Sequence, residues 1–262
     1  MSNNPFDVHG VKYLSPNSIN KFKQNPAKWL TNIAGYTDRL YIPAFTNGNA
    51  IEAGLTHAIM NGASIAESTD VAMEEYQRIR TEAKDAGFNY DLDGCNKKQL
   101  RAPDILATVI PKYRAFGVPV AMQKWVEWEW EDLPIPVRGI IDLEYEDCVR
   151  DLKTTSVKPK NNDNYNRQLT IYALATDKVP YIDYVYSTTK IAELQTFEIP
   201  DINEHIKDVK RIAMKMMRLL SLSDDIEEVC YLSCLDPNLS NDNWYDQWGH
   251  NEVRGAKKLF IK

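Results

Sequence analysis

The sequence predicts one domain of the α/β or α+β class, in which helices flank a central mixed β-sheet. Three observations support this fold class. Apolar residues recur at helical spacing as far as Phe116, strict alternation of apolar and charged residues begins soon after it, and a helical segment then separates two groups of strand-like segments. A chain of 262 residues can bury a core of this kind without disulfide bonds.

Helix signals dominate the N-terminal part of the chain. Ser15 is a predicted N-cap with Pro16 at the first helical position, and Pro26 starts a second short helix. Three later segments have apolar residues at helical spacing: 47–65, 70–84 and 103–116. The polar segment 86–98 contains Gly and Asn residues and predicts a loop.

Strand signals begin with the segment KWVEWEWED. Here Val126, Trp128 and Trp130 alternate with glutamates, which is the pattern of a sheet with one buried and one solvated face. Four more segments are strand-like: 136–145, 148–154, 183–188 and 194–199. Two helices complete this half of the chain: 164–176 and 202–222.

These elements divide residues 1–262 into three regions of one domain. We expect an N-terminal helical region, a core and a C-terminal tail: 1–46, 47–222 and 223–262. From Pro237 onward the tail is rich in Asn, Asp and Trp, and we assign no regular element to that segment. We expect Trp244, Tyr245 and Trp248 to stabilise the tail by packing.

Composition narrows the class of protein. The chain is 44% apolar and 26% charged, and no run of about 18 apolar residues could cross a bilayer. Its first residues lack the basic start and apolar stretch of an export signal, so we expect a cytoplasmic location. Four cysteines match neither a disulfide framework nor a zinc pattern. The net charge of −6 means that any contact with nucleic acid would use a local basic patch.

Two acids in the segment RGIIDLEYEDCVRDLKTTS form the first candidate site. If Glu146 and Asp147 make a two-residue turn, then Asp142 lies directly opposite Asp151. Like charges at that position, with Cβ atoms about 4.5 to 5.5 Å apart, are destabilising. A divalent cation such as Mg²⁺ between the two carboxylates would offset this repulsion. Lys153 would point to the same face of its strand as Asp151.

A simpler interpretation of the same residues is an exposed ion pair, because Asp-X-Lys on a strand is common and contributes little stability. Gly139, which allows a close approach, and the apolar residues of both strands favour a site instead. A bulge in place of the tight turn would shift the register. In the helix that follows, Gln168 and Tyr172 share one face, which would lie over the carboxylates, although a helical tyrosine more often serves the core.

Five motifs occur in the order LSPNSINKFKQNPAKW, GNAIE, GIIDL, DLKTT and QLTIYA, and they cover most of 13–175. Together they resemble the PD-(D/E)XK nuclease superfamily, and within it the RecB-like exonucleases, including the CRISPR-associated and phage members. The resemblance implies a restriction-endonuclease-like core and metal-dependent hydrolysis of phosphodiester bonds.

The resemblance also implies roles for individual residues. Asp142 and Asp151 correspond to metal-binding carboxylates, the Leu152 carbonyl to a further ligand, and Lys153 to the residue that orients or activates the attacking water. Residues of the following helix correspond to a motif that contacts DNA and supports the site: Gln168 and Tyr172.

At one metal position the chain departs from its relatives, which often have histidine four residues after the glycine of the first core helix. Glu52 occupies this position, and a carboxylate suits Mg²⁺ or Mn²⁺ as well as imidazole does. His57 is five residues further along, about 140° around the helix, so we expect it to pack near the site and consider it a less well placed candidate ligand.

Many relatives also bind an iron–sulfur cluster through one N-terminal and three C-terminal cysteines. In this chain Asn25 precedes Pro26, and only Cys230 and Cys234 lie near the C-terminus. Because a cluster normally needs four ligands, we expect none.

The expected partner is DNA, with a recombination or replication protein as a further candidate. Lys158 and Lys160 would contact phosphates beside the site, and the basic residues of 202–222 would either do the same or form a solvated helix face. The first functional hypothesis is an exonuclease in recombination, repair or phage replication. Its alternatives are a structure-specific endonuclease, a non-cutting module that binds DNA or protein, and a polysaccharide- or nucleotide-binding protein.

Overall fold

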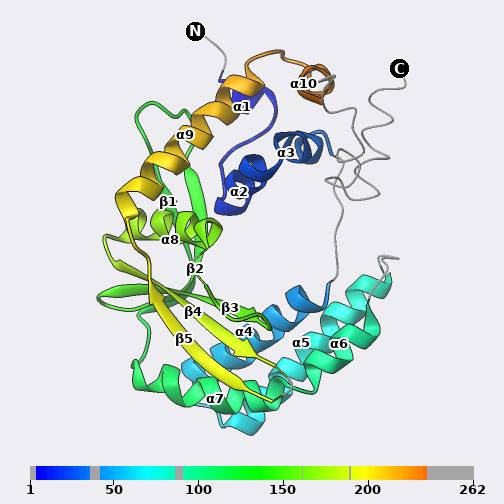
Figure 1. Ribbon diagram of the computed structural model, residues 1–262, viewed down its shortest axis with the longest axis vertical. Helices are drawn as coiled ribbons and strands as arrows, with labels where there is room; N and C mark the ends of the chain where they lie inside the picture. The colour runs from blue at the N-terminus through cyan, green and yellow to red at the C-terminus, as the bar shows by residue number, and fades with distance from the viewer. Residues whose placement is uncertain (1–3, 36–41, 86–90, 161, 189, 235–262) are drawn as a thin grey trace.

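The computed structural model of the chain describes residues 4–35, 42–85, 91–160, 162–188 and 190–234. It shows a five-stranded mixed sheet with helices on both faces, which confirms the expected fold class (Figure 1). The strands are β1 (Ala121–Trp128), β2 (Val137–Glu144), β3 (Cys148–Thr155), β4 (Val179–Ser187) and β5 (Ala192–Glu198).

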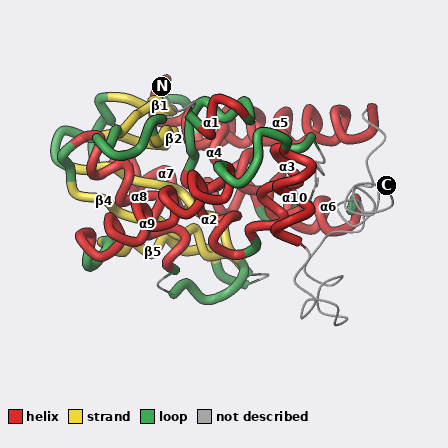
Figure 2. The backbone as a smooth tube through the Cα atoms, turned by 90° about the horizontal axis from the view of Figure 1, so that it is seen from above, coloured by secondary structure: helices red, strands yellow, loops and turns green. Residues whose placement is uncertain are grey.

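Ten helices surround this sheet in the described part of the chain. They are α1 (Pro5–Val8), α2 (Pro16–Gln24), α3 (Pro26–Ile33), α4 (Pro43–Asn61), α5 (Ile65–Asp85), α6 (Leu92–Gln99), α7 (Ala102–Ala115), α8 (Asp163–Thr176), α9 (Ile202–Leu220) and α10 (Ile226–Cys234). Figure 2 shows the strands gathered in one half of the molecule and α3, α6 and α10 in the other.

The strands lie in the order β1-β2-β3-β4-β5. The pairs β1/β2, β2/β3 and β4/β5 are antiparallel, whereas β3 and β4 are parallel. Two parallel neighbours need a crossover connection, and α8 supplies it. This connection places α8 against β1, β2, β3 and β4, directly over the hairpin that contains the candidate carboxylates.

Two apolar cores lie on opposite faces of the sheet. One core includes residues of α2, α3, α8 and α9, with Leu30, Leu169 and Met216 fully buried. The other joins α4, α5 and α7 to the sheet through residues such as Leu55 and Leu106. Burial on both faces explains why the first five residues of β3 are all buried, although Arg150 and Asp151 are among them.

The strands β2 and β3 are paired only near their turn. The ladder between them contains two residue pairs, Leu143 with Arg150 and Glu144 with Val149, and Tyr145 N–H donates to the Cys148 carbonyl at 2.8 Å. Glu146 and Asp147 therefore form the expected two-residue turn, and the expected register is confirmed.

The N-terminal segment takes the place of β3 beside the other end of β2. Leu14 forms a parallel bridge with Val137; its N–H donates to the Pro136 carbonyl at 3.0 Å and its carbonyl accepts from Arg138 N–H at 2.8 Å. We call the region where β2 and β3 diverge, between the ladder and this bridge, the fork. Backbone groups of β2 in the fork are thus satisfied in part by a segment more than a hundred residues away.

Several expected boundaries differ from the structure. The predicted loop 86–98 is wrong for its second half, because Asp91 caps α6 by accepting from Gly94 N–H at 2.9 Å, and Cys95 of α6 is fully buried. The helix expected to begin at residue 47 begins at Pro43, the first helical position.

The beginning of the C-terminal region also has regular structure. Helix α10 packs against α3 and α9, and its residues Val229 and Cys230 are fully buried. Cys95, Cys148 and Cys230 are all buried thiols without a disulfide bond. The expected packing of Trp244, Tyr245 and Trp248 lies outside the described residues.

Among the described helices, none combines the length and the apolar character that a membrane span requires.

Gly139, in the fork, allows the ring of Tyr172 to pack directly on the backbone of β2. A Cβ atom on Gly139 would lie 2.5 Å from Cε1 of Tyr172, so Gly139→Ala forces an overpacked contact. We expect this substitution to lower the free energy of unfolding by about 1 to 3 kcal/mol, measured by urea denaturation.

The matched control is Gly48→Ala. The nearest atom to a Cβ on Gly48 is Thr154 Oγ1 at 3.6 Å, an ordinary contact, and Gly48 lies inside α4. This substitution should raise the free energy of unfolding by roughly 0.5 to 1 kcal/mol, the usual gain for Gly to Ala in a helix. Equal effects of both substitutions would contradict the packing argument.

Candidate active site

Asp142 lies where β2 and β3 diverge. Its Oδ2 accepts a hydrogen bond at 2.8 Å from the backbone N–H of Leu152, so the side chain spans the fork that the ladder leaves open. Leu152 is buried on the opposite strand, one position beyond Asp151. The hydrogen bond fixes the carboxylate of Asp142 beside that of Asp151.

Asp151 is fully buried, at 0% exposure, and is held from two sides. Gln168 of α8 donates to its Oδ1 at 2.8 Å, and Lys153 of the same strand forms an ion pair with its Oδ2. The side chain of Lys153 is only 24% exposed. The exposed ion pair considered from sequence is therefore wrong, because α8 covers both side chains.

Gln168 connects the carboxylate to the next turn of α8. Its Nε2 also donates to the hydroxyl of Tyr172 at 2.7 Å, and the ring of Tyr172 packs on Gly139 in the fork. Burial raises the pKa of Tyr172 above its ordinary value, so this residue stays a neutral phenol at any physiological pH. The two residues share one face of α8 and lie over the carboxylates, as the spacing predicts.

Glu52 of α4 approaches the site from the opposite side of the sheet. It is linked to Asp142 through Gln123 of β1, which donates to Glu52 Oε1 and makes a longer contact of 3.4 Å with Asp142 Oδ1. Gln123 lies between residues that pair with Leu143 and Ile141, so it is opposite Asp142 in the sheet. The structure thus brings Glu52 within one side chain of Asp142.

Sequence reasoning missed Gln123. Its φ of 48° is in the left-handed region, which is uncommon for residues other than glycine and is often found where function requires strain. Glutamine in a strand carries no local signal for this conformation. The contacts of its amide with two acids across 71 and 19 positions of sequence became visible only in the folded chain.

Burial is the main cause that raises the pKa of Glu52, Asp142 and Asp151 above the ordinary carboxyl values. For Asp142 the negative charge of Asp151 is the next cause, and the charge of Lys153 acts in the opposite direction. Burial of the Lys153 ammonium lowers its pKa, but Asp151 and Asp142 outweigh this, so the pKa of Lys153 is raised and the group stays protonated.

Arginine does not neutralise these acids. The nearest buried arginine in the sequence, Arg150, instead donates to both oxygens of Asp183 at 2.9 and 3.1 Å on the other face of the sheet. Around the site, three carboxyl groups face one ammonium group. Oδ2 of Asp151 is buried, and its partner is the ammonium group of Lys153.

These observations bear on whether the residues suit a divalent metal ion. Three carboxyl groups against one ammonium group leave an excess of acids, which a hard cation would offset. In the described ranges, however, no three His, Cys, Asp or Glu side chains converge closely enough to hold an ion. Gln123 separates Glu52 from Asp142, and Lys153 contacts Asp151. The side chains of Gln123 and Lys153 would therefore have to move to admit an ion. The types of donor atom therefore fit a metal ion, whereas the carboxyl groups lie further apart than the ligands of a bound ion would.

The other predicted site residues lie further from the carboxylates. The ring of His57 contacts the amide of Asn61, 2.8 Å away, and both line a shallow pocket that also includes Glu52. Lys158 and Lys160 are exposed in the segment between β3 and α8. On α9, three of the basic residues form ion pairs with acids: Lys207, Lys210 and Arg211. This pairing favours the solvated helix face over a DNA contact for α9.

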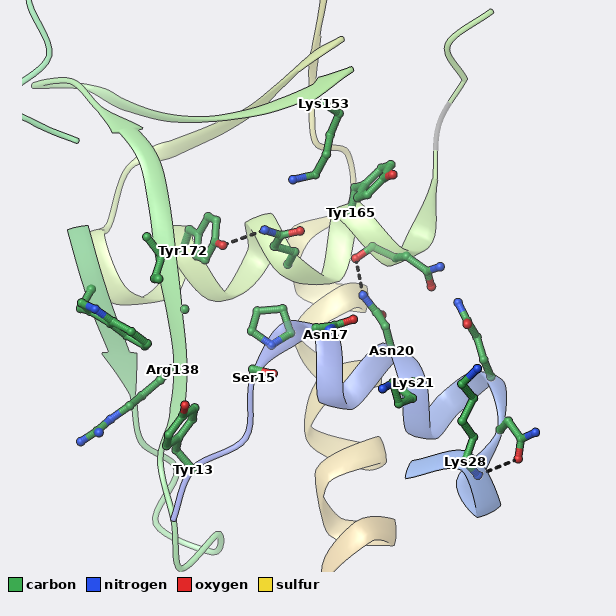
Figure 3. Close-up of a pocket in the computed structure, with 18 of the residues that line it drawn as sticks. Tyr13, Ser15, Asn17, Asn20, Lys21, Lys28, Arg138, Lys153, Tyr165 and Tyr172 are labelled. Atoms are coloured by element: carbon green, nitrogen blue, oxygen red, sulfur yellow. Dashed lines mark hydrogen bonds between the residues drawn. The ribbon is translucent and has the colours of Figure 1, made fainter. Parts of the chain in front are cut away.

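A large groove opens beside the fork and reaches Lys153 (Figure 3). Its volume is about 1210 Å³, and it is lined by residues of α2, α8, β1 and β2. The wall formed by α2 is fixed to α8, because Asn20 donates to the Asn164 carbonyl at 2.9 Å and accepts from Arg167 at 2.7 Å. Gln168 and Tyr172 line the same groove, which thus reaches two side chains that contact Asp151, those of Gln168 and Lys153.

Comparison with known proteins gives a match to one protein family. The family model of the PD-(D/E)XK nuclease superfamily matches residues 13–221. No curated protein matches the sequence.

Solved structures show the fold. The crystal structure of a presumed exonuclease from Eubacterium rectale aligns with a TM-score of 0.57 and 12% sequence identity, over 89% of this chain and 87% of that one. The structure of the protein SSO0001 aligns with a TM-score of 0.33 and 13% identity, over 84% of this chain and 96% of that one.

The raised pKa of Asp142 predicts how stability depends on pH. Without metal, the folded chain holds a proton on Asp142 at pH values where the unfolded chain has released it, so the contribution of Asp142 to stability falls as pH rises above about 4. Asp142→Asn removes this penalty. In the presence of a chelator at pH 7, the melting temperature should rise by roughly 2 to 4 °C, and the gain should shrink towards pH 4.

Asp132→Asn is the matched control. Asp132 is exposed, and its hydrogen bond with Lys210 lowers its pKa, so the same chemical change should give no stabilisation at pH 7. A melting temperature of Asp142→Asn below that of the wild type at pH 7 would show that Asp142 is not under electrostatic strain.

Proposed function

Because the chain belongs to the PD-(D/E)XK nuclease superfamily, we propose that it is a metal-dependent deoxyribonuclease that hydrolyses phosphodiester bonds. The observation that carries the proposal is the set of Asp142, Asp151 and Lys153, in which Asp151 is fully buried and Lys153 lines a groove of about 1210 Å³. The chemistry requires this kind of site, since hydrolysis of a phosphodiester depends on positioning and on stabilising negative charge.

We assign metal binding to Asp142 and Asp151, with Glu52 and the Leu152 carbonyl as further ligands. A bound Mg²⁺ or Mn²⁺ would polarise the phosphoryl oxygen, lower the pKa of a bound water and stabilise the leaving oxygen. The donors are oxygen atoms, which both ions prefer. We assign His57, whose ring contacts Asn61, to a position beside the site and outside the ligand set.

Lys153 is the third member of the set. Since its pKa is raised, it carries a proton at neutral pH and donates rather than accepts. We therefore assign it to orienting the attacking water and to stabilising the negative charge of the phosphate, and not to removing a proton. Gln168 positions Asp151, and Tyr172 positions Gln168 through their mutual hydrogen bond.

Among nucleases, an exonuclease acting on DNA ends is our first assignment. The sequence motifs favour it, and the protein from Eubacterium rectale with a similar fold is a presumed exonuclease. Such an enzyme would process ends in recombination, repair or phage replication. A structure-specific endonuclease is the alternative, and circular DNA distinguishes the two activities because it has no ends.

The test is digestion of end-labelled DNA with Mg²⁺, with Mn²⁺ and with a chelator. We expect cleavage with either metal and none with the chelator. Asp151→Asn and Lys153→Ala should each lower the rate at least about 100-fold, the scale on which loss of one electrostatic group acts. Linear DNA should be degraded, and covalently closed circular DNA should not.

Lys207→Ala provides the control, because Lys207 is exposed on α9 and pairs only with Glu204 among the contacts described. It should cleave at the wild-type rate. Unchanged activity in both site variants would remove this site from the reaction, and cleavage of circular DNA would replace the exonuclease assignment with the endonuclease.

A further inference from the structure

The lining of the groove has an unusual composition for this protein. The chain has more acidic than basic residues, 37 against 31, yet no Asp or Glu is found among the described residues that line the groove. Four lining residues are basic: Lys21, Lys28, Arg138 and Lys153. Two of them also form ion pairs with acids outside the lining, Arg138 with Glu127 and Lys153 with Asp151. Six carry side-chain amides: Asn17, Asn20, Gln24, Asn25, Asn164 and Gln168. A groove of this kind favours a ligand with a chain of phosphates and with hydrogen-bonding edges.

Aromatic rings line the same groove and are exposed to it. Trp125 of β1 is 60% exposed and Tyr13 is 40% exposed, and their rings meet edge to face with centroids 6.5 Å apart. The Arg138 guanidinium lies over the Tyr13 ring at 5.5 Å from the centroid, and Figure 3 shows both side chains together on one wall. Large apolar rings exposed in a basic groove indicate a partner with flat apolar faces.

The backbone holds these rings in place. Trp125 pairs with Ile140 of β2, and the bridge at Leu14 fixes Tyr13, its preceding neighbour, next to Arg138. Trp125 and Arg138 therefore lie on strands, and the Leu14 bridge ties the irregular segment that contains Tyr13 to β2. We call Trp125, Tyr13 and Arg138 together the stacking platform. In this way it is built like the stacking surfaces of proteins that bind single-stranded nucleic acids.

We propose that this groove binds an unpaired DNA strand, with Trp125 and Tyr13 stacking on its bases and the basic residues contacting its phosphates. The inference rests on the proposed nuclease function, and it specifies the form of the substrate. Bases in a duplex already stack on one another, so their faces are not available to rings on a groove wall. An unpaired strand offers those faces.

The geometry also gives a length. Arg138, Ile140 and Asp142 are alternate residues of β2, so Arg138 lies roughly 14 Å from Asp142 along the strand at about 3.4 Å per residue. A stacked DNA strand advances about 3.4 Å per nucleotide, so roughly four nucleotides separate the stacking platform from the carboxylates. Unpaired ends shorter than this would not reach both.

Binding is measured without cleavage, in a chelator at low salt, by fluorescence anisotropy of a labelled oligonucleotide that is either single-stranded or annealed to its complement. The wild type should bind the single strand more tightly. Trp125→Ala should weaken single-strand binding roughly tenfold, equivalent to about 1.4 kcal/mol, and leave duplex binding unchanged. Tyr13→Ala should act in the same direction.

Two variants serve as controls for folding and surface change. Trp125→Phe keeps a ring and should recover most of the affinity, whereas Phe45→Ala removes a ring of similar exposure, 54%, that does not line the groove and should have no effect. Duplexes with unpaired ends of increasing length should bind more tightly up to roughly four nucleotides and then level off.

The proposal is overturned if the duplex binds as tightly as the single strand, or if Trp125→Ala binds the single strand like the wild type. Because the assay contains no metal, its outcome is separate from that of the nuclease assay. Binding of the single strand without any cleavage would reject the nuclease function and leave the strand-binding proposal standing. Cleavage without an effect of Trp125→Ala on binding would leave the nuclease function standing and reject the strand-binding proposal.

Discussion

The divergence of β2 from β3 is the constraint on which the site depends. The ladder between the two strands contains only the pairs Leu143 with Arg150 and Glu144 with Val149. Beyond it, the side chain of Asp142 accepts a hydrogen bond from the backbone N–H of Leu152. The same opening admits the ring of Tyr172 over Gly139 and forms one side of the groove. A hairpin paired along its full length would place main-chain hydrogen bonds where the carboxylates now lie.

Charge is the second consequence of this geometry. The fork holds Asp142 and Asp151 together under α8, where burial makes their repulsion costly, and Lys153 offsets only part of it. Buried charged residues that lower the stability of the fold are typical of functional sites. The energetic cost also explains the arrangement around the acids, since Gln168 and Gln123 supply amide donors to carboxylates that no arginine neutralises.

Sequence reasoning predicted the parts of the site that depend on local rules. A tight turn was enough to predict the register of the hairpin, and helical spacing was enough to bring Gln168 and Tyr172 to one face of α8. The strands diverge before Asp142 and Asp151 can pair directly, so the two acids are neighbours but not ladder partners. Long-range contacts were beyond those rules. The groove depends on the bridge between Leu14 and β2, and the position of Gln123 depends on a left-handed backbone that its residue type does not signal.

The central claim is that a divalent cation is what makes the buried acids tolerable. Anomalous diffraction from crystals soaked in Mn²⁺ tests it most directly. The account predicts a peak within about 2.5 Å of oxygens from both Asp142 and Asp151, with the amide of Gln123 moved away from Asp142. A saturated crystal with no peak between these carboxylates, in which Lys153 and Gln123 keep their present contacts, would contradict it.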